Sequence, residues 1–326
     1  MSDVTSLIAR SVQRSGRAGG GWNRLGFVIS LLVIVAAGFV LVGILRDIDL
    51  NRVFEMIRST ARRDIALAGC FVAMSYVTLT FYDYFSLRTL GHDHVPYRIA
   101  AMASFTSYSI GHNLGATVLT AGAVRWRIYC PWRLSAVDIA KMAFVTGLTF
   151  WLGNIVVLGL GLVLMPDAAG AVDQMPSWVN RLLGAFGLVA IACYLAWLWL
   201  REPTIGRGAW SIALPSAALT FVQIGIGLLD LTAGGLALYM LLPPAPAIDF
   251  PSVLVIYVTA SLIGFLSHAP GSLGVFEAAV LLALPQFPKE GLLATLLIFR
   301  CLYFVLPLLA AIGIMAVREL WLAPRE

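Results

Sequence analysis

Six long apolar segments limit the folds that are open to this chain. They lie at about 26–45, 64–87, 135–164, 181–200, 210–241 and 290–316, and a helix needs roughly 20 apolar residues to cross a bilayer. Backbone amides inside hydrocarbon must be satisfied within the protein, so segments of this kind become helices. With 60% of the 326 residues hydrophobic and only 12% charged, a soluble fold is excluded. The sequence predicts an all-α polytopic membrane protein, whose first segment is too long for a signal-peptide core and is expected to be a retained anchor.

Two further apolar segments, about 98–124 and 251–284, are broken in the middle. Residues 111–115 of the first read Gly-His-Asn-Leu-Gly, and residues 267–277 of the second read Ser-His-Ala-Pro-Gly-Ser-Leu-Gly-Val-Phe-Glu. Irregular backbone at membrane depth is tolerated only where protein or a water-filled cavity satisfies its amides. We therefore expect each segment to enter the membrane, turn, and return as a re-entrant helical hairpin, which leaves six full crossings.

The distribution of basic residues predicts how the chain threads the membrane, because Arg and Lys concentrate in cytoplasmic loops. The tail 1–25 and the run 125–133 are rich in arginine and are expected in the cytoplasm, together with the C-terminal tail. Residues 46–63 do not fit, since they carry five arginines on the predicted outer side. Leu50, Val53 and two further apolar residues recur there at helical spacing, which indicates an interfacial amphipathic helix.

The threading exposes an internal repeat. His112 and His268 each begin a His-x-x-Gly pattern at a predicted hairpin tip, and Asp83 and Asp230 each lie in the span before a hairpin. Two halves that run in opposite directions and contain broken helices are typical of secondary transporters. The predicted division is a basic cytoplasmic tail at 1–25, one transmembrane domain at 26–318 with repeats at about 26–164 and 181–316, and a cytoplasmic tail at 319–326.

Four charged residues in the apolar segments are candidates for a functional site, because ionisable groups at membrane depth are rare and costly. Asp83 could belong to the site or snorkel to the headgroups. Asp230, near mid-span, could form a charge pair or a structural hydrogen bond. Arg300, about 15 Å into the last span at 1.5 Å per residue, needs an acid such as Glu277 or Asp230, or a lipid phosphate. Glu277 could alternatively cap the helix that follows the second tip.

The tips add further candidates. The two histidines could relay protons or be satisfied by backbone, and helix starts after the glycines could bind an anionic headgroup with free amides. Arg125 is most simply a topology determinant, although it could also gather anionic lipid. The predicted substrate-binding set is Arg300, Glu277, Gly271, Gly274, His268, Asp230, Asp83, His112, Asn113, Gly115 and Arg125.

Enzymatic patterns are missing from the sequence. It contains no phosphate-binding loop, no nucleophile motif and no metal-ligand spacing, and its four cysteines are scattered singly, which favours simple packing roles. We expect no catalytic activity and no cofactor, metal or nucleic acid.

Two stretches, 119–129 and 270–277, resemble the lysylphosphatidylglycerol synthase transmembrane family, the flippase-like module of bacterial multiple peptide resistance proteins. Tyr82-Asp83, Asp230, and Arg300 followed by Tyr303 and Pro307 are similar to that family's pattern as well. The resemblance implies a bacterial inner-membrane protein that moves phospholipid between leaflets. The family's best-known members continue into an aminoacyl-transferase domain, whereas this sequence ends at Glu326, so lysyl transfer is not expected.

From these observations we expect a phospholipid flippase or lipid-transport component. An anionic headgroup would bind between the two hairpin tips, with Arg300 and helix amides on its phosphate, and an ion gradient or a partner would supply energy. Two alternatives stay open at this point: a non-transporting scaffold for lipid-modifying enzymes, and a secondary transporter of a small polar solute. The possible protein partners are a lipid enzyme or a second copy of the chain.

Overall fold

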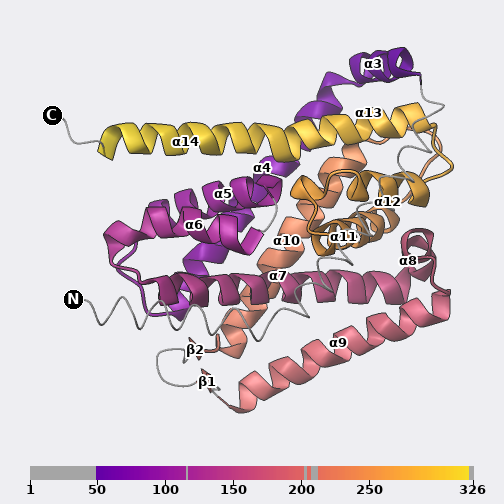
Figure 1. Ribbon diagram of the computed structural model, residues 1–326. Helices are drawn as coiled ribbons and strands as arrows, with labels where there is room; N and C mark the ends of the chain where they lie inside the picture. Colours follow the sequence, from indigo (N-terminus) through magenta and orange to yellow (C-terminus); the bar gives the residue numbers. More distant parts are fainter. Residues whose placement is uncertain (1–48, 115–116, 202–203, 207–211, 323–326) are drawn as a thin grey trace, which may run out of the picture.

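The computed structural model describes residues 49–114, 117–201, 204–206 and 212–322, and nearly all of them are helical (Figure 1). The α-helices are α3 (Leu50–Ser59), α4 (Arg62–Thr89), α5 (Tyr97–Leu114), α6 (Thr117–Tyr129), α7 (Ala136–Leu164), α8 (Pro166–Asp173), α9 (Ser177–Leu200), α10 (Ala217–Leu241), α11 (Phe250–Leu266), α12 (Val275–Ala283), α13 (Lys289–Arg300) and α14 (Leu306–Leu322). Short 3₁₀ turns are η1 (Cys130–Trp132) and η3 (Pro270–Ser272), and the two-residue strands β1 (Thr204–Ile205) and β2 (Ile212–Ala213) pair antiparallel.

Within this described part, five helices are long and apolar enough to cross a membrane: α4, α7, α9, α10 and the continuous α13–α14. They coincide with five of the six predicted spans and confirm the class of an all-α polytopic membrane protein. The sixth, at 26–45, lies outside the described residues. Helices α13 and α14 are joined by η4 (Cys301–Val305), a single turn of π-helix. Such turns often mark functional sites, and this one begins directly after Arg300.

The second broken segment is interrupted where the sequence predicts, and each of the two segments forms a pair of packed helices. Helices α5 and α6 pack along each other, and α11 packs against α12. The break in the second segment contains His268 and the short turn η3, while the predicted break of the first segment includes residues 115–116, which are not among the described residues. Two helical pairs are therefore present, and their re-entrant placement in a membrane stays a prediction.

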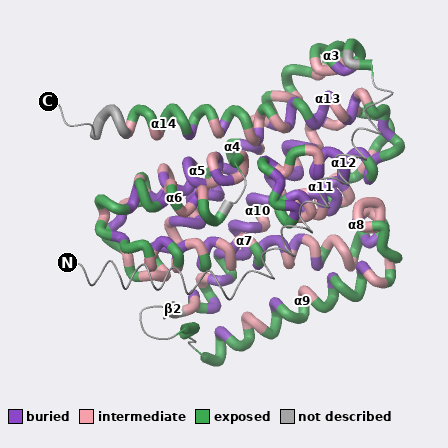
Figure 2. The backbone as a smooth tube through the Cα atoms, in the orientation of Figure 1, coloured by how far each residue is buried: buried purple, intermediate pink, exposed green. Residues whose placement is uncertain are grey.

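Helix α10 lies at the centre of the molecule, packed against α4, α7 and α11, and Figure 2 shows the buried residues concentrated around it. Without a hydrophobic driving force between helices in lipid, close approach depends on small residues. Gly153 of α7 faces Gly227 of α10 so closely that a Cβ on either would lie 2.8 Å from the other's Cα. Helix α9 covers the outer side of α7 and is mostly exposed.

The order of elements occurs twice: long helix, helical pair, long helix. It runs α4, α5–α6, α7 and then α10, α11–α12, α13–α14. In Figure 1, α4 and α10 cross in opposite directions, and α7 also runs opposite to α13–α14. The inverted repeat itself, with its boundaries at about 26–164 and 181–316, stays a prediction.

Two smaller predictions have clear outcomes. The amphipathic helix expected within 46–63 is α3, which buries Val53 and packs on α13. The packing role expected for the cysteines is wrong, because all four (Cys70, Cys130, Cys193 and Cys301) are exposed. Three of them are on apolar helices, where an exposed thiol faces outward rather than into the core.

Candidate functional site

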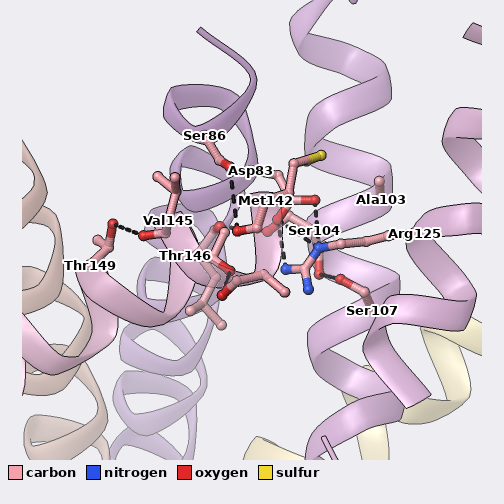
Figure 3. A network of polar contacts seen from close by, with 12 residues as sticks. Asp83, Ser86, Ala103, Ser104, Ser107, Arg125, Met142, Val145, Thr146 and Thr149 are labelled. Carbon is pink, nitrogen blue, oxygen red and sulfur yellow. Dashed lines mark hydrogen bonds and ion pairs between the residues drawn. The ribbon is translucent and has the colours of Figure 1, made fainter. Parts of the chain in front are cut away.

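Asp83 and Arg125 form a buried ion pair between α4 and α6 (Figure 3). The guanidinium binds the carboxylate as a fork, with Nε 3.0 Å from Oδ2 and a terminal nitrogen 2.7 Å from Oδ1. Tyr129 donates to Oδ2 at 3.0 Å, and the ring of Tyr108 lies 5.0 Å from the guanidinium carbon. Asp83 is fully buried and Arg125 is 4% exposed. The snorkelling interpretation of Asp83 is therefore wrong, and Arg125 lies inside the helix bundle rather than on a cytoplasmic surface.

Glu277 and Arg300 form a second pair, between α12 and α13. Arg300 Nε donates to Glu277 Oε1 at 2.7 Å, and its terminal nitrogens reach the same oxygen and the carbonyl of Gly271, the latter at 2.9 Å. The other oxygen of Glu277 accepts from the Gly274 amide at 2.8 Å. Glu277 is thus both the partner of Arg300 and the cap of α12. Its carboxylate accepts from the Gly274 amide, directly before the helix start whose amides the sequence suggested as donors for a headgroup.

The tip of the second hairpin has an unusual backbone. His268, Gly271, Ser272 and Gly274 all have positive φ, between 52° and 79°, a region that costs free energy for residues with a side chain. Backbone of this kind clusters at functional sites, where the surroundings hold it in place. Here the bond from Arg300 to the Gly271 carbonyl is one such restraint.

The two hairpin tips meet. A Cβ built on Gly271 would lie 3.7 Å from the carbonyl oxygen of Asn113 and 3.9 Å from that of His112. Asn113 also donates from Nδ2 to the carbonyl of Phe304 at 3.2 Å. Phe304 follows Arg300 of the second ion pair by four residues. The sequence expectation that the tips come together is therefore supported by direct proximity.

A cavity of about 370 Å³ lies beside this junction. Its walls include His112 of the first hairpin, His268 and Ser272 of the second, and Asp230 of α10, within a lining surface that is mainly apolar and aromatic. His268 Nδ1 is 2.8 Å from the carbonyl of Leu266, so backbone satisfies this ring nitrogen.

Asp230 extends from α10 into a group of hydroxyls. Ser75 of α4 donates to its Oδ1 at 2.5 Å, and the same serine oxygen is 3.1 Å from the Tyr303 hydroxyl. Tyr76 donates to the Tyr303 carbonyl at 2.9 Å. Asp230 is the partner of a serine and not of Arg300, which resolves the choice of acids left open by the sequence.

The predicted residues thus fall into four groups. His112, His268 and Asp230 line the cavity; Asn113, Gly271, Gly274, Glu277 and Arg300 form the adjoining tip junction; Asp83 and Arg125 form a separate pair; and Gly115 lies outside the described residues. Sequence reasoning missed Ser75, Tyr108, Tyr129 and Tyr257, which contact the charged groups or line the cavity. Polar residues of this kind are common in membrane helices, and nothing in the sequence distinguishes these four. No grouping of His, Cys, Asp and Glu suited to a metal ion occurs among the described residues.

Fold and site together define a polytopic helical membrane protein with a cavity beside the tip junction and two ion pairs between its helices. No family model matches the chain. It is 33% identical over 245 residues to the uncharacterized protein slr0712 of Synechocystis sp., covering 74% of this chain and 76% of that protein. It is 29% identical over 300 residues to the inner membrane protein YbhN of Escherichia coli, covering 89% and 91%. The chain belongs to the family of slr0712, a family of bacterial membrane proteins to which YbhN is also related.

A shorter match connects this family to a lipid enzyme. Over 67 residues, 20% of this chain, the sequence is 37% identical to the phosphatidylglycerol lysyltransferase of Staphylococcus haemolyticus, of which the match covers 8%. The resemblance stated above is therefore supported as a relationship between membrane families.

Proposed function

We propose that the protein moves phospholipid between the leaflets of the bacterial inner membrane, by itself or as part of a lipid-transport assembly, without covalent chemistry on the lipid. The observation that carries the proposal is the cavity of about 370 Å³ walled by both hairpin tips, a volume within the range of small-molecule sites. Its mainly apolar lining suits a lipid better than a small polar solute. The relatives named above, one an inner membrane protein and one a phosphatidylglycerol lysyltransferase, support the same substrate class.

In this proposal the headgroup binds at the tip junction. Arg300 donates to the Gly271 carbonyl of the second tip, and guanidinium binds phosphate in the same forked geometry as carboxylate. A phosphate would have to displace Glu277 from Arg300, and that exchange would also release the Gly271 carbonyl and the Gly274 amide, to which this ion pair is bonded. Binding an anionic headgroup would thus loosen the strained tip, and reformation of the pair would expel the lipid.

Gly271 offers a direct test. Gly271→Leu places a side chain at φ +59°, with its Cβ 3.4 Å from a terminal nitrogen of Arg300, and the αL backbone costs a residue with a side chain about 1–2 kcal/mol. We expect normal insertion and abundance but no lipid movement in reconstituted vesicles, measured by leaflet-specific quenching of labelled phospholipid. Gly313→Leu is the matched control, because nothing lies within 4 Å of a Cβ at that position.

The two possible failures distinguish an error in the proposed function from an error in the proposed headgroup site. If the wild-type protein moves no phospholipid, alone or with the membrane proteins that co-purify with it, the proposed function is wrong. If Gly271→Leu moves lipid at the wild-type rate, the tip junction is architectural and the headgroup binds elsewhere.

A further inference from the structure

The described part of the chain contains three buried carboxylates, and they differ in one respect. Asp83 and Glu277 are each bound to an arginine. Asp230, 8% exposed, has no cation within ion-pair distance, and its one hydrogen bond within the described structure is the bond that Oδ1 accepts from Ser75. Asp230 lines the cavity, and its Oδ2 has no hydrogen-bond partner among these residues.

The groups around Asp230 cannot neutralise it as a carboxylate. The titratable groups close to it are tyrosines: Tyr76 and Tyr82 on α4, Tyr257 on α11 and Tyr303 in η4. The titratable side chains farther along the cavity wall are Tyr108, His112 and His268, and α7 contributes the neutral Asn154. The nearby arginines are already bound to the two other acids.

An ionised carboxylate in such a place has two costs. Burial without a counter-charge is unfavourable, and the negative charge repels any phosphate that enters the same cavity. A proton on Oδ2 removes both costs and leaves the bond from Ser75 to Oδ1 intact. A sodium ion could do the same in principle, but it requires several oxygen ligands, and Ser75 and Tyr303 already direct hydrogen bonds within this group.

We infer that Asp230 is the proton-coupling site of this protein, and that it takes up one proton at Oδ2 when lipid enters the cavity and releases that proton when lipid leaves. The inference rests on the proposed function. No bond to the lipid forms or breaks: the proton comes from water on the more acidic side of the membrane and returns to water on the other side. Lipid movement would then be driven by the proton gradient.

The experiment uses the full chain in vesicles, with a fluorescent anionic phospholipid as the probe and leaflet-specific quenching as the readout. One proton per lipid permits up to about a tenfold change in leaflet ratio per unit of pH difference. With about two units imposed we expect a shift of several-fold, abolished by a protonophore and unaffected by a sodium gradient. Asp230→Asn should make whatever movement remains independent of the pH gradient, whereas Glu55→Gln, on the exposed face of α3, should retain the wild-type response.

A second readout does not depend on transport. Infrared difference spectra of the purified protein, between mildly acidic and alkaline pH, should contain a protonated-carboxyl band that is missing in Asp230→Asn and present in Glu55→Gln. Lipid movement that ignores the pH gradient, or follows a sodium gradient, would overturn the inference and leave the proposed function standing. A wild-type protein without the band would overturn it as well, even if Asp230→Asn proved inactive. A wild-type protein that moves no lipid under any gradient would instead contradict the proposed function.

Discussion

Arg125→Ala is expected to be the most damaging single removal of charge in this protein. Arg125 supplies three hydrogen bonds to the fully buried Asp83. After truncation Tyr129 would be the remaining donor to that carboxylate among the described residues. Breaking a buried pair by removing one member typically costs about 3–5 kcal/mol, because an uncompensated charge stays buried. We expect a loss of stability in that range, which includes the lost contact between the guanidinium and the ring of Tyr108.

The double variant Asp83→Ala/Arg125→Ala isolates the cause. Removing both charges eliminates the uncompensated carboxylate, so the double variant should be more stable than Arg125→Ala alone by about 1–3 kcal/mol. The assay is the free energy of unfolding in mixed micelles, followed by denaturant titration. Arg98→Ala, an exposed arginine on α5, is the matched control and should stay within about 0.5 kcal/mol of wild type. A cost below about 1 kcal/mol for Arg125→Ala, the usual value of a surface pair, would refute the reasoning, as would a double variant as unstable as the two single losses combined.

Three further predictions concern packing, the second pair and topology. Gly153→Ala should lower the free energy of unfolding by about 1–3 kcal/mol, because its Cβ meets backbone of α10 at 2.8 Å and overpacking of this kind is destabilising. Gly147→Ala on the same helix, with open space around it, should be neutral or stabilising in the same unfolding assay. Arg300→Lys should retain part of the lipid movement and of the bound phospholipid, because an ammonium keeps the charge but lacks the fork; full activity in Arg300→Ala would reduce this pair to a structural role. In a background without the other thiols, the native exposed Cys130 and a cysteine at Gln286 should react with impermeant reagents from opposite sides, and labelling of both from the periplasm would contradict the re-entrant arrangement.

Hydropathy and helix breakers were sufficient to locate most of the fold, because membrane spans are specified by local composition. The need of Arg300 for an acidic partner could also be predicted from the sequence. An arginine so deep in an apolar helix needs a partner, and only Glu277 and Asp230 were available at comparable depth. In the structure the partner is Glu277. The packing of α12 against α13 determines this choice over Asp230, and no property visible in the sequence does.

The first pair could not be anticipated in the same way. Arg125 stands in a run with Arg127 and Arg133, where basic residues are ordinarily topology signals. Nothing in that run distinguishes the one arginine that turns inward from the two that are exposed. The distinction arises from the packing of α6 against α5, which brings Arg125 over the ring of Tyr108. The cavity was anticipated only in part: a site between the two hairpin tips was expected, but nothing in the sequence indicated its aromatic wall, which includes Tyr108 and Tyr257 from the two halves of the chain.

The two ion pairs are expected to fail in different ways, because they occupy different places in their hairpins. Arg125 lies eight residues into α6, about 12 Å along the helix from its start at Thr117, and it binds the long helix that precedes the hairpin. Glu277 lies in the first turn of α12, beside the strained tip, and binds the helix that follows. The side chains of the first pair are 5% and 0% exposed, and those of the second are 15% and 11%. A pair that lies away from the tip and outside the cavity lining holds the helices together, whereas a pair at the tip can open without unpacking them. Variants of Arg125 should therefore lose stability in proportion to activity, and variants of Arg300 should lose lipid movement while the protein remains folded.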